Sequence, residues 1–298
     1  MRDYSKEFES RVAFIRSRLE SSGMKGIVYG NSGGKDSALV GILCKAACDD
    51  TVGIIMPCAS SRNYSIDRDD GLEVAEKFGI ECRFVDLTDT RGALVSALGG
   101  AVELTDMAVA NIAPRLRMAA LYAVALSEGR LVAGTGNASE AYVGYFTKWG
   151  DGAHDFNPIA DLTVTEIYEF LEYLGAPRSV IEKAPSAGLF EGQTDEGEMG
   201  LTYADIDAYL LRGEGSAETI SKIESMHAAS EHNRAPLAGY RGGNIWQPAA
   251  GLCPGGGFLV LLINKAVVYR ITVQNHVLNC RHNSLQFVIP DNCIIYSF

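Results

Sequence analysis

A glycine-rich loop between an apolar run and a helical pattern sets the first limit on how this chain folds. The apolar residues 26–29 are typical of a buried strand, and apolar residues follow with helical spacing at positions 39, 40, 42, 43 and 46. The loop between them, Ser32 to Ser37, reads Ser-Gly-Gly-Lys-Asp-Ser. This order places the loop where open parallel sheets bind ligands, outside the carboxyl end of a strand.

The same alternation of apolar strand and helix continues along the chain. Further strands are predicted at residues 52–56, 82–87 and 131–133, and helices at residues 3–20, 70–78 and 105–127. The predicted strands are continuously apolar, as expected for strands that are buried on both faces. The pattern therefore predicts an α/β protein with a doubly wound, open parallel sheet flanked by helices.

The composition of the glycine loop predicts that it holds an anion. Glycine lets the backbone approach closely, so that main-chain N–H groups and the hydroxyls of Ser32 and Ser37 can surround a phosphate. A carboxylate at Asp36 would be repelled by bound phosphate unless a divalent cation lay between them. The loop thus predicts Mg²⁺ between Asp36 and pyrophosphate oxygens, and a turn with a first-turn helix acid is the plainer alternative.

Three segments follow the last predicted strand. Thr163 and Glu166 have the spacing of a capping box, and the helical apolar pattern after them runs to Gly175. Residues 184–200 are rich in glycine and acid and have no period, which favours a mobile lid. Another helix is predicted at residues 202–211.

Charge divides the chain into two parts. The 26 basic and 37 acidic residues give a formal net charge of −11, which disfavours nonspecific nucleic-acid binding. Residues 241–298 hold four basic residues and one acidic residue, so residues 1–240 carry −14. We predict a domain at 1–240 and an atypical, β-rich tail at 241–298, either a small appendage or a shifted reading frame. Strand-like runs in the tail lie at 258–263, 266–273, 286–289 and 293–296.

The start of the chain and its apolar runs bear on location. No stretch reaches the ~18 uninterrupted apolar residues of a membrane span. The first residues lack the apolar segment of a signal peptide. A cytoplasmic protein without a membrane partner is expected.

Several blocks resemble known families. Ser32 to Ser37 resembles the SGGxDS signature of the ATP pyrophosphatase (PP-loop) superfamily, whose members split ATP into AMP and pyrophosphate. Further blocks resemble NAD synthetases in family order, at residues 111–118, 135–152, 185–196 and 231–234. The resemblance covers roughly residues 5 to 236 and implies an adenine nucleotide alpha hydrolase-like fold.

The resemblance implies ATP-dependent amidation of deamido-NAD (nicotinic acid adenine dinucleotide) to NAD, through an acyl-adenylate, with release of AMP and pyrophosphate. Adenylation is needed because a carboxylate is a poor acyl donor, whereas an acyl-adenylate loses AMP, a stabilised anion. Glutamine-dependent relatives carry a large N-terminal amidase domain, and only about 25 residues precede the first predicted strand here. Ammonia is therefore the expected nitrogen donor.

The same resemblance assigns roles to individual residues. ATP is expected at Gly30, Asn31, Ser32, Gly33, Gly34, Lys35, Asp36, Ser37, Thr135 and Ser186. Mg²⁺ is expected at Asp36 and Glu140, and catalytic roles at Asp36, Glu140 and Asp151. Deamido-NAD is expected at Arg115, Lys148, Asp155, His232 and Asn233. By the same analogy, a homodimer is expected.

Two positions depart from the family pattern. Val164 stands where the family commonly has a lysine, and Asn233 stands where the closing block has another lysine. Lys183 or Lys148 is a candidate to supply the charge that Val164 lacks. These departures leave a non-catalytic nucleotide-binding relative as one rival function. Another PP-loop enzyme, such as a tRNA-modifying ligase, is the other, because the superfamily includes such enzymes, and the charge of −14 counts against it.

Overall fold

The computed structural model describes residues 2–58, 66–183, 194–235, 269–273 and 276–280. The chain divides into two compact units, Met1–Ala238 and Gly239–Phe298. In the second unit, β5 (Tyr269–Val273) and β6 (His276–Cys280) pair antiparallel. β5 falls in one predicted run, β6 was not predicted, and the other three predicted runs of the tail lie outside the described residues.

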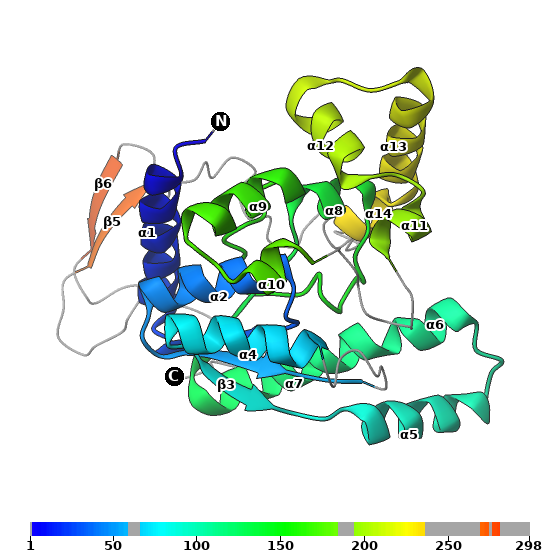
Figure 1. Cartoon of the computed structure of the whole chain (residues 1–298). Coiled ribbons are helices and arrows are strands. Elements are labelled where there is room, and N and C mark those ends of the chain that lie inside the picture. Colours follow the sequence, from blue (N-terminus) through cyan, green and yellow to red (C-terminus); the bar gives the residue numbers. More distant parts are fainter. Residues whose placement is uncertain (1, 59–65, 184–193, 236–268, 274–275, 281–298) are drawn as a thin grey trace. The chain divides into compact units, whose positions relative to one another are not determined.

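The first unit is built on a four-stranded parallel sheet with the order β3-β2-β1-β4 (Figure 1). Its strands are β1 (Gly26–Gly30), β2 (Thr51–Ile55), β3 (Glu81–Phe84) and β4 (Arg130–Ala133). β1 pairs in parallel with β2 on one side and with β4 on the other, so the strand order reverses at β1. The predicted open parallel sheet is confirmed, and its switch point lies where β1 leads into the glycine loop.

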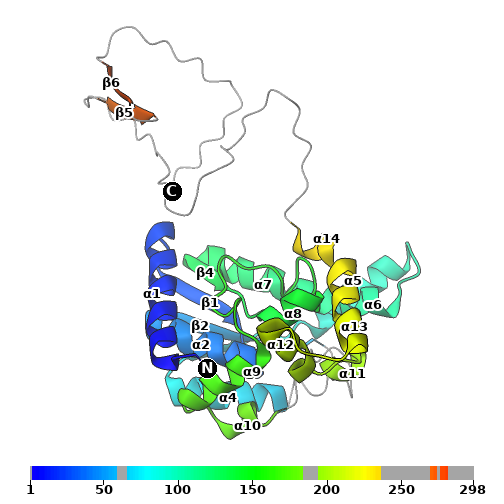
Figure 2. The same ribbon diagram turned by 90° about the horizontal axis from the view of Figure 1, so that it is seen from above.

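Helices cover both faces of this sheet (Figure 2). One face is packed by α1 (Tyr4–Ser22), α2 (Lys35–Ala47), α4 (Ile66–Phe78), α9 (Val164–Tyr173) and α10 (Arg178–Ile181). The other face is packed by α7 (Ile112–Glu128), and α5 (Thr88–Gly99) contacts α7. Side chains of β1 alternate between the two cores, since Ile27 and Tyr29 face the first and Val28 faces the second.

The helix predicted at residues 105–127 is in fact two helices. α6 (Asp106–Ala110) ends at Asn111, and α7 begins at Ile112. Pro114 explains the break, because it lacks the N–H that a continuous helix would donate to Ala110, whereas a first-turn proline is tolerated. The interval Asp106–Glu128 is long and apolar enough to cross a membrane by length and composition. In this fold α7 packs along β1 and β4, where Leu121 and Ala125 are buried in the second core.

A third apolar cluster joins α9 to the helices that follow the sheet. These helices are α8 (Ala138–Val143), α11 (Asp195–Met199), α12 (Tyr203–Arg212) and α13 (Ala217–Ala229). α14 (Glu231–Arg234) follows α13 and adds no residue to the cluster. The cluster contains Val143, Val164, Met199, Leu201, Tyr203, Ile206 and Ile223. α11 lies within residues 184–200, which were predicted to form a lid without regular structure. That prediction is wrong for residues 195–199, which are helical. Residues 184–193 lie outside the described part of the chain.

Candidate active site

The glycine loop has a shape that only glycine permits at one position. Gly33 has a φ of +69°, and a Cβ there would collide with the carbonyl oxygen of Asp67. Asn31 fixes the loop from within, because its Oδ1 accepts a hydrogen bond from Gly33 N (3.3 Å) and its Nδ2 donates one to Gly71 O (3.0 Å). The hydroxyls of Ser32 and Ser37 lie 3.1 Å apart across the loop. The loop therefore presents hydroxyls and the N-terminus of α2 together.

Two carboxylates from different elements face each other beside this loop. Asp36 lies in the first turn of α2 and Glu140 in the first turn of α8. Asn137 links them, since its Oδ1 accepts from Glu140 N (2.9 Å) and its Nδ2 donates to Asp36 Oδ1 (3.0 Å). Lys35 Nζ lies 2.9 Å from Asp36 Oδ2.

The electrostatics of the pair are dominated by burial. Burial, and then the charge of Asp36, raise the pKa of Glu140 to about 8, and the charge of Lys35 acts against this shift. A carboxyl group with a raised pKa in a cavity is a usual mark of a functional site. At neutral pH and without a further cation, Glu140 therefore keeps a proton that an exposed glutamate would have lost.

A cavity of about 480 Å³ opens beside the loop and the acid pair. Among the predicted site residues it is lined by Gly30, Asn31, Ser32, Gly34, Lys35, Asp36, Ser37, Thr135, Glu140 and Asp151. Asp151 Oδ1 accepts a hydrogen bond from Thr147 N (3.0 Å), and the protein enclosing the carboxyl raises its pKa. The structure thus brings together the residues predicted to bind ATP, except that Gly33 does not line the cavity and Ser186 lies outside the described residues.

Two cationic residues of the cavity were not among the predicted site residues. Arg117 donates from Nε to Met56 O (3.0 Å), and burial lowers its pKa. Lys183 Nζ donates to Gly33 O (3.1 Å) and lies 2.8 Å and 2.6 Å from carboxylate oxygens of Asp67 and Asp70. Arg117 belongs to the same sequence block as Arg115, residues 111–118, and this block is the sequence feature that could have identified Arg117 as a site residue. Lys183 had been considered only as a substitute for the charge missing at Val164.

The residues predicted to bind deamido-NAD lie outside the lining of this cavity. Three of them form a chain of contacts, since Arg115 Nε donates to Lys148 O (3.3 Å) and Lys148 Nζ donates to His232 O (2.5 Å). Asn233 lies beside His232 on α14. Asp155 lies apart from this chain, with its Oδ2 accepting from Val132 N (2.8 Å).

The structure separates the two lysines proposed to compensate for Val164. Val164 is 3% exposed and packs in the third apolar cluster. Lys183 touches the phosphate loop, whereas the ammonium of Lys148 is bonded to α14. Only Lys183 is thus placed beside the loop.

These features are those of an α/β nucleotide-binding fold, with a glycine loop and two carboxylates at the switch point of an open parallel sheet. The sequence model described as NAD synthase matches residues 7–236, and the chain belongs to that family. It is 47% identical to the NH(3)-dependent NAD(+) synthetase of Carboxydothermus hydrogenoformans over 235 residues, which are 78% of this chain and 96% of that protein. The resemblance found in the sequence is confirmed.

Solved structures agree with this assignment. The NMN synthetase from Francisella tularensis has a TM-score of 0.76 and 34% identity, covering 80% of this chain and 99% of that chain. The NH3-dependent NAD synthetase from Campylobacter jejuni has a TM-score of 0.67 and 28% identity, covering 81% of this chain and 100% of that chain. The order of strands and helices is therefore that of known NAD synthetases.

Proposed function

We propose that this chain amidates deamido-NAD to NAD in the cytoplasm, using ATP and ammonia. The observation that carries the proposal is that Asp36 of the phosphate loop and Glu140 of α8 line one cavity and are linked through Asn137. The relative from Carboxydothermus hydrogenoformans is named for this activity, and the alignment with this chain covers 96% of its length. Membership of the family supports the same reaction.

The residues of the cavity suit a two-step acyl transfer. In the first step, the nicotinate carboxylate attacks the α-phosphorus of ATP, a new P–O bond forms, and the bond to pyrophosphate breaks. In the second, ammonia attacks the acyl carbon, loses a proton, and displaces AMP. Charge accumulates on the departing pyrophosphate, which the hydroxyls of Ser32 and Ser37 and the N-terminus of α2 can hold.

The donor set also fits Mg²⁺, which takes a few carboxylate oxygens and completes its octahedron with phosphates and water. Asp36 and Glu140 supply two carboxylates that repel each other when both are charged. Among the described residues no group of three or more metal-ligating side chains occurs, so phosphate and water would complete the set. We propose that Asp36 and Glu140 hold Mg²⁺, which when bound neutralises charge on the phosphates.

An assay of products tests the reaction. The protein is incubated with deamido-NAD, ATP, MgCl₂ and ammonium, and NAD and AMP are measured. We expect equal amounts of both from the wild type. Asp36→Asn should form neither NAD nor AMP. Asp69→Asn, an exposed acid of α4, is the matched control. Intact ATP binding without NAD would favour a non-catalytic relative, and turnover only with tRNA would favour another PP-loop enzyme.

One comparison favours a second substrate. The NMN synthetase from Francisella tularensis has a higher TM-score and identity than the NAD synthetase from Campylobacter jejuni. We therefore propose deamido-NMN, the carboxylate form of NMN, as the competing substrate. The ratio of kcat/KM for deamido-NAD and deamido-NMN decides between them, and a ratio below one would make NMN synthesis the principal activity.

We also propose that the protein is a homodimer. The proposal rests on family analogy. Large apolar side chains are exposed on β3, α6 and α7, with Phe84 50%, Met107 58% and Leu126 87% exposed, and α5 and α6 bury no residue of their own. These elements are the candidates for the interface. Sedimentation should give twice the chain mass of 32.0 kDa, and an active monomer would contradict the proposal.

A further inference from the structure

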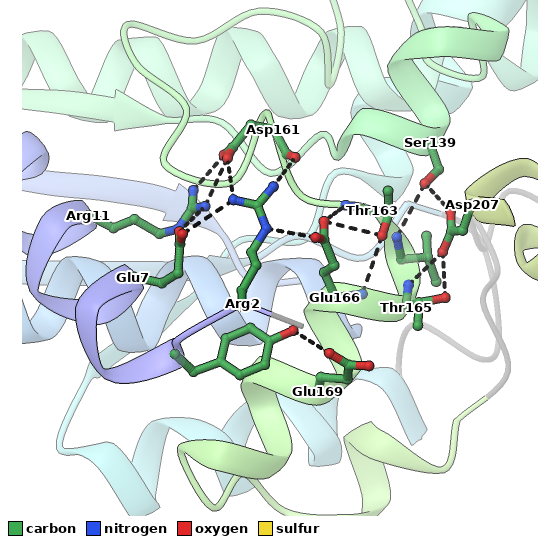
Figure 3. A network of polar contacts seen from close by, with 12 residues as sticks. Arg2, Glu7, Arg11, Ser139, Asp161, Thr163, Thr165, Glu166, Glu169 and Asp207 are labelled. Atoms are coloured by element: carbon green, nitrogen blue, oxygen red, sulfur yellow. Dashed lines mark hydrogen bonds and ion pairs between the residues drawn. The ribbon is translucent and has the colours of Figure 1, made fainter. Parts of the chain in front are cut away.

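A buried carboxylate outside the cavity connects three helices. Asp207 of α12 is 2% exposed. Its oxygens accept hydrogen bonds from Ser139 Oγ (2.5 Å), from Thr165 N (2.7 Å) and from Thr165 Oγ1 (2.7 Å) (Figure 3). One side chain of α12 is therefore bonded to the first turn of α8 and to the first turn of α9.

The contact with Ser139 reaches the acid pair directly. Ser139 is fully buried and precedes Glu140 in the first turn of α8. Its hydroxyl donates to Asp207 and accepts from Val164 N (3.2 Å), so both its capacities as donor and acceptor are used. Asn137, the N-cap of the same turn, donates to Asp36. The turn is thus held by Asp207 on one side and meets Asp36 on the other.

The start of α9 is fixed from the opposite direction as well. Arg2 Nε donates to Glu166 Oε1 (2.7 Å), while Glu166 Oε2 accepts from Thr163 N (3.0 Å) (Figure 3). Arg2 and Arg11 also bond to Asp161, so the segment before α9 is tied to α1. Asp207 therefore connects α8 to a part of the structure that is anchored to the sheet.

At position 207 a carboxylate satisfies its partners better than the neutral amide of asparagine would. All its partners act as donors here: two hydroxyls and a backbone N–H. A carboxylate accepts at both oxygens, whereas an asparagine would turn an NH₂ group toward one of these donors. The N-terminus of α9 adds favourable partial charge. A buried charge that is fully hydrogen-bonded fixes geometry, because no alternative arrangement satisfies it.

We propose that Asp207 is a positioning residue that holds the first turn of α8, through Ser139, so that Glu140 and Asn137 stay opposite Asp36 when Mg·ATP binds. The inference rests on the proposed role of the acid pair. Asp207 does not line the cavity, so its effect would pass through Ser139 and the turn.

Two variants test the inference by different routes. Asp207→Asn alters all three contacts of the carboxylate. Ser139→Ala leaves the bonds from Thr165 and removes the Ser139–Asp207 bond, together with the bond that Val164 N donates to the Ser139 hydroxyl. Asp205→Asn is the matched control, because it makes the same charge change at an exposed position of α12. Binding of ATP is titrated calorimetrically against Mg²⁺ concentration without the second substrate. Unfolding is measured on the same samples.

We expect the Mg²⁺ concentration for half-maximal ATP binding to rise about tenfold in Asp207→Asn and severalfold in Ser139→Ala, as for the loss of supporting contacts around a metal site. The control should remain at the wild-type value. Lower stability with unchanged Mg²⁺ dependence in Ser139→Ala would overturn the inference, whether or not Asp207→Asn folds. If the wild type binds Mg·ATP but makes no NAD, the proposed reaction fails while this test still stands.

Discussion

Glu140 is expected to destabilise the metal-free protein, and the variant Glu140→Gln measures by how much. Burial and the nearby charge of Asp36 raise the pKa of Glu140 from 4.5 to about 8. A raised pKa means that the folded state holds the proton more tightly than the unfolded chain does. The stability contributed by this proton is complete below about pH 4.5 and is lost as the pH rises through about 8.

The size of the effect follows from the shift. One pKa unit corresponds to about 1.4 kcal/mol, so at pH 7 keeping Glu140 protonated costs the folded state about 3 kcal/mol relative to the unfolded chain. At pH 5 the same cost is about 1 kcal/mol. Glutamine is neutral at both pH values and can accept the bond from Asn137 N. Glu140→Gln should therefore stabilise the metal-free protein, and more at pH 7 than at pH 5.

Urea unfolding in the presence of EDTA at both pH values gives the comparison. Glu20→Gln, which changes an exposed glutamate of α1, is the control and should alter the free energy of unfolding by less than about 0.5 kcal/mol. A stability difference that is the same at pH 5 and pH 7 would refute the reasoning, because it would show that the glutamate is not protonated by its surroundings. Loss of stability at pH 7 would refute it too.

Three further predictions concern the scaffold around the site. Gly33→Ala should weaken ATP binding and lower the free energy of unfolding by about 2 kcal/mol, because of its positive φ and the collision with Asp67, while Gly34→Ala, with a negative φ, should lower it much less. Arg11→Met should lower stability by about 1 kcal/mol in denaturant unfolding, because Pro158 O loses its buried donor while Asp161 keeps its ion pair with Arg2, whereas the exposed Arg16→Met should lower it less. Tyr29→Phe should leave stability unchanged or raise it by up to about 1 kcal/mol, since the Tyr29 hydroxyl is buried without a partner among the described residues; a clear loss would contradict this.

The positions of the strands along the chain were predictable because their signals are local, whereas their order in the sheet was not predicted. The apolar residues 26–29 form β1, and they are apolar on both faces of the sheet because Ile27 and Val28 pack into different cores. The helix at residues 88–99 gave no such signal, because α5 buries no side chain and thus needs no apolar stripe. The break between α6 and α7 at Asn111 has a local cause in the sequence, which is Pro114 three positions later.

The site shows a different limit of sequence reasoning. Arg115 and Arg117 are two positions apart on α7, which places them roughly 200° apart around the helix axis. A motif that contains both cannot say which one faces a cavity, and only Arg117 lines the one described here. Ser139 and Asp207 are 68 positions apart, so no local pattern joins them. Such contacts depend on how α8, α9 and α12 pack.

The pairing of charges in the cavity bears on which form of ATP the site selects. Lys35 lies 2.9 Å from an oxygen of Asp36, and Lys183 is bonded to two carboxylates. Since both ammonium groups already have anionic partners, free ATP would gain little from them and would be repelled by the charge of Asp36, while Glu140, whose pKa is raised to about 8, is mostly protonated at pH 7. A divalent cation brought with the phosphates reverses that repulsion, because it attracts the acid pair and the phosphates together. On the proposed metal site, selection for Mg·ATP over free ATP would be a property of the acid pair, and it would require that α8 keep Glu140 in place.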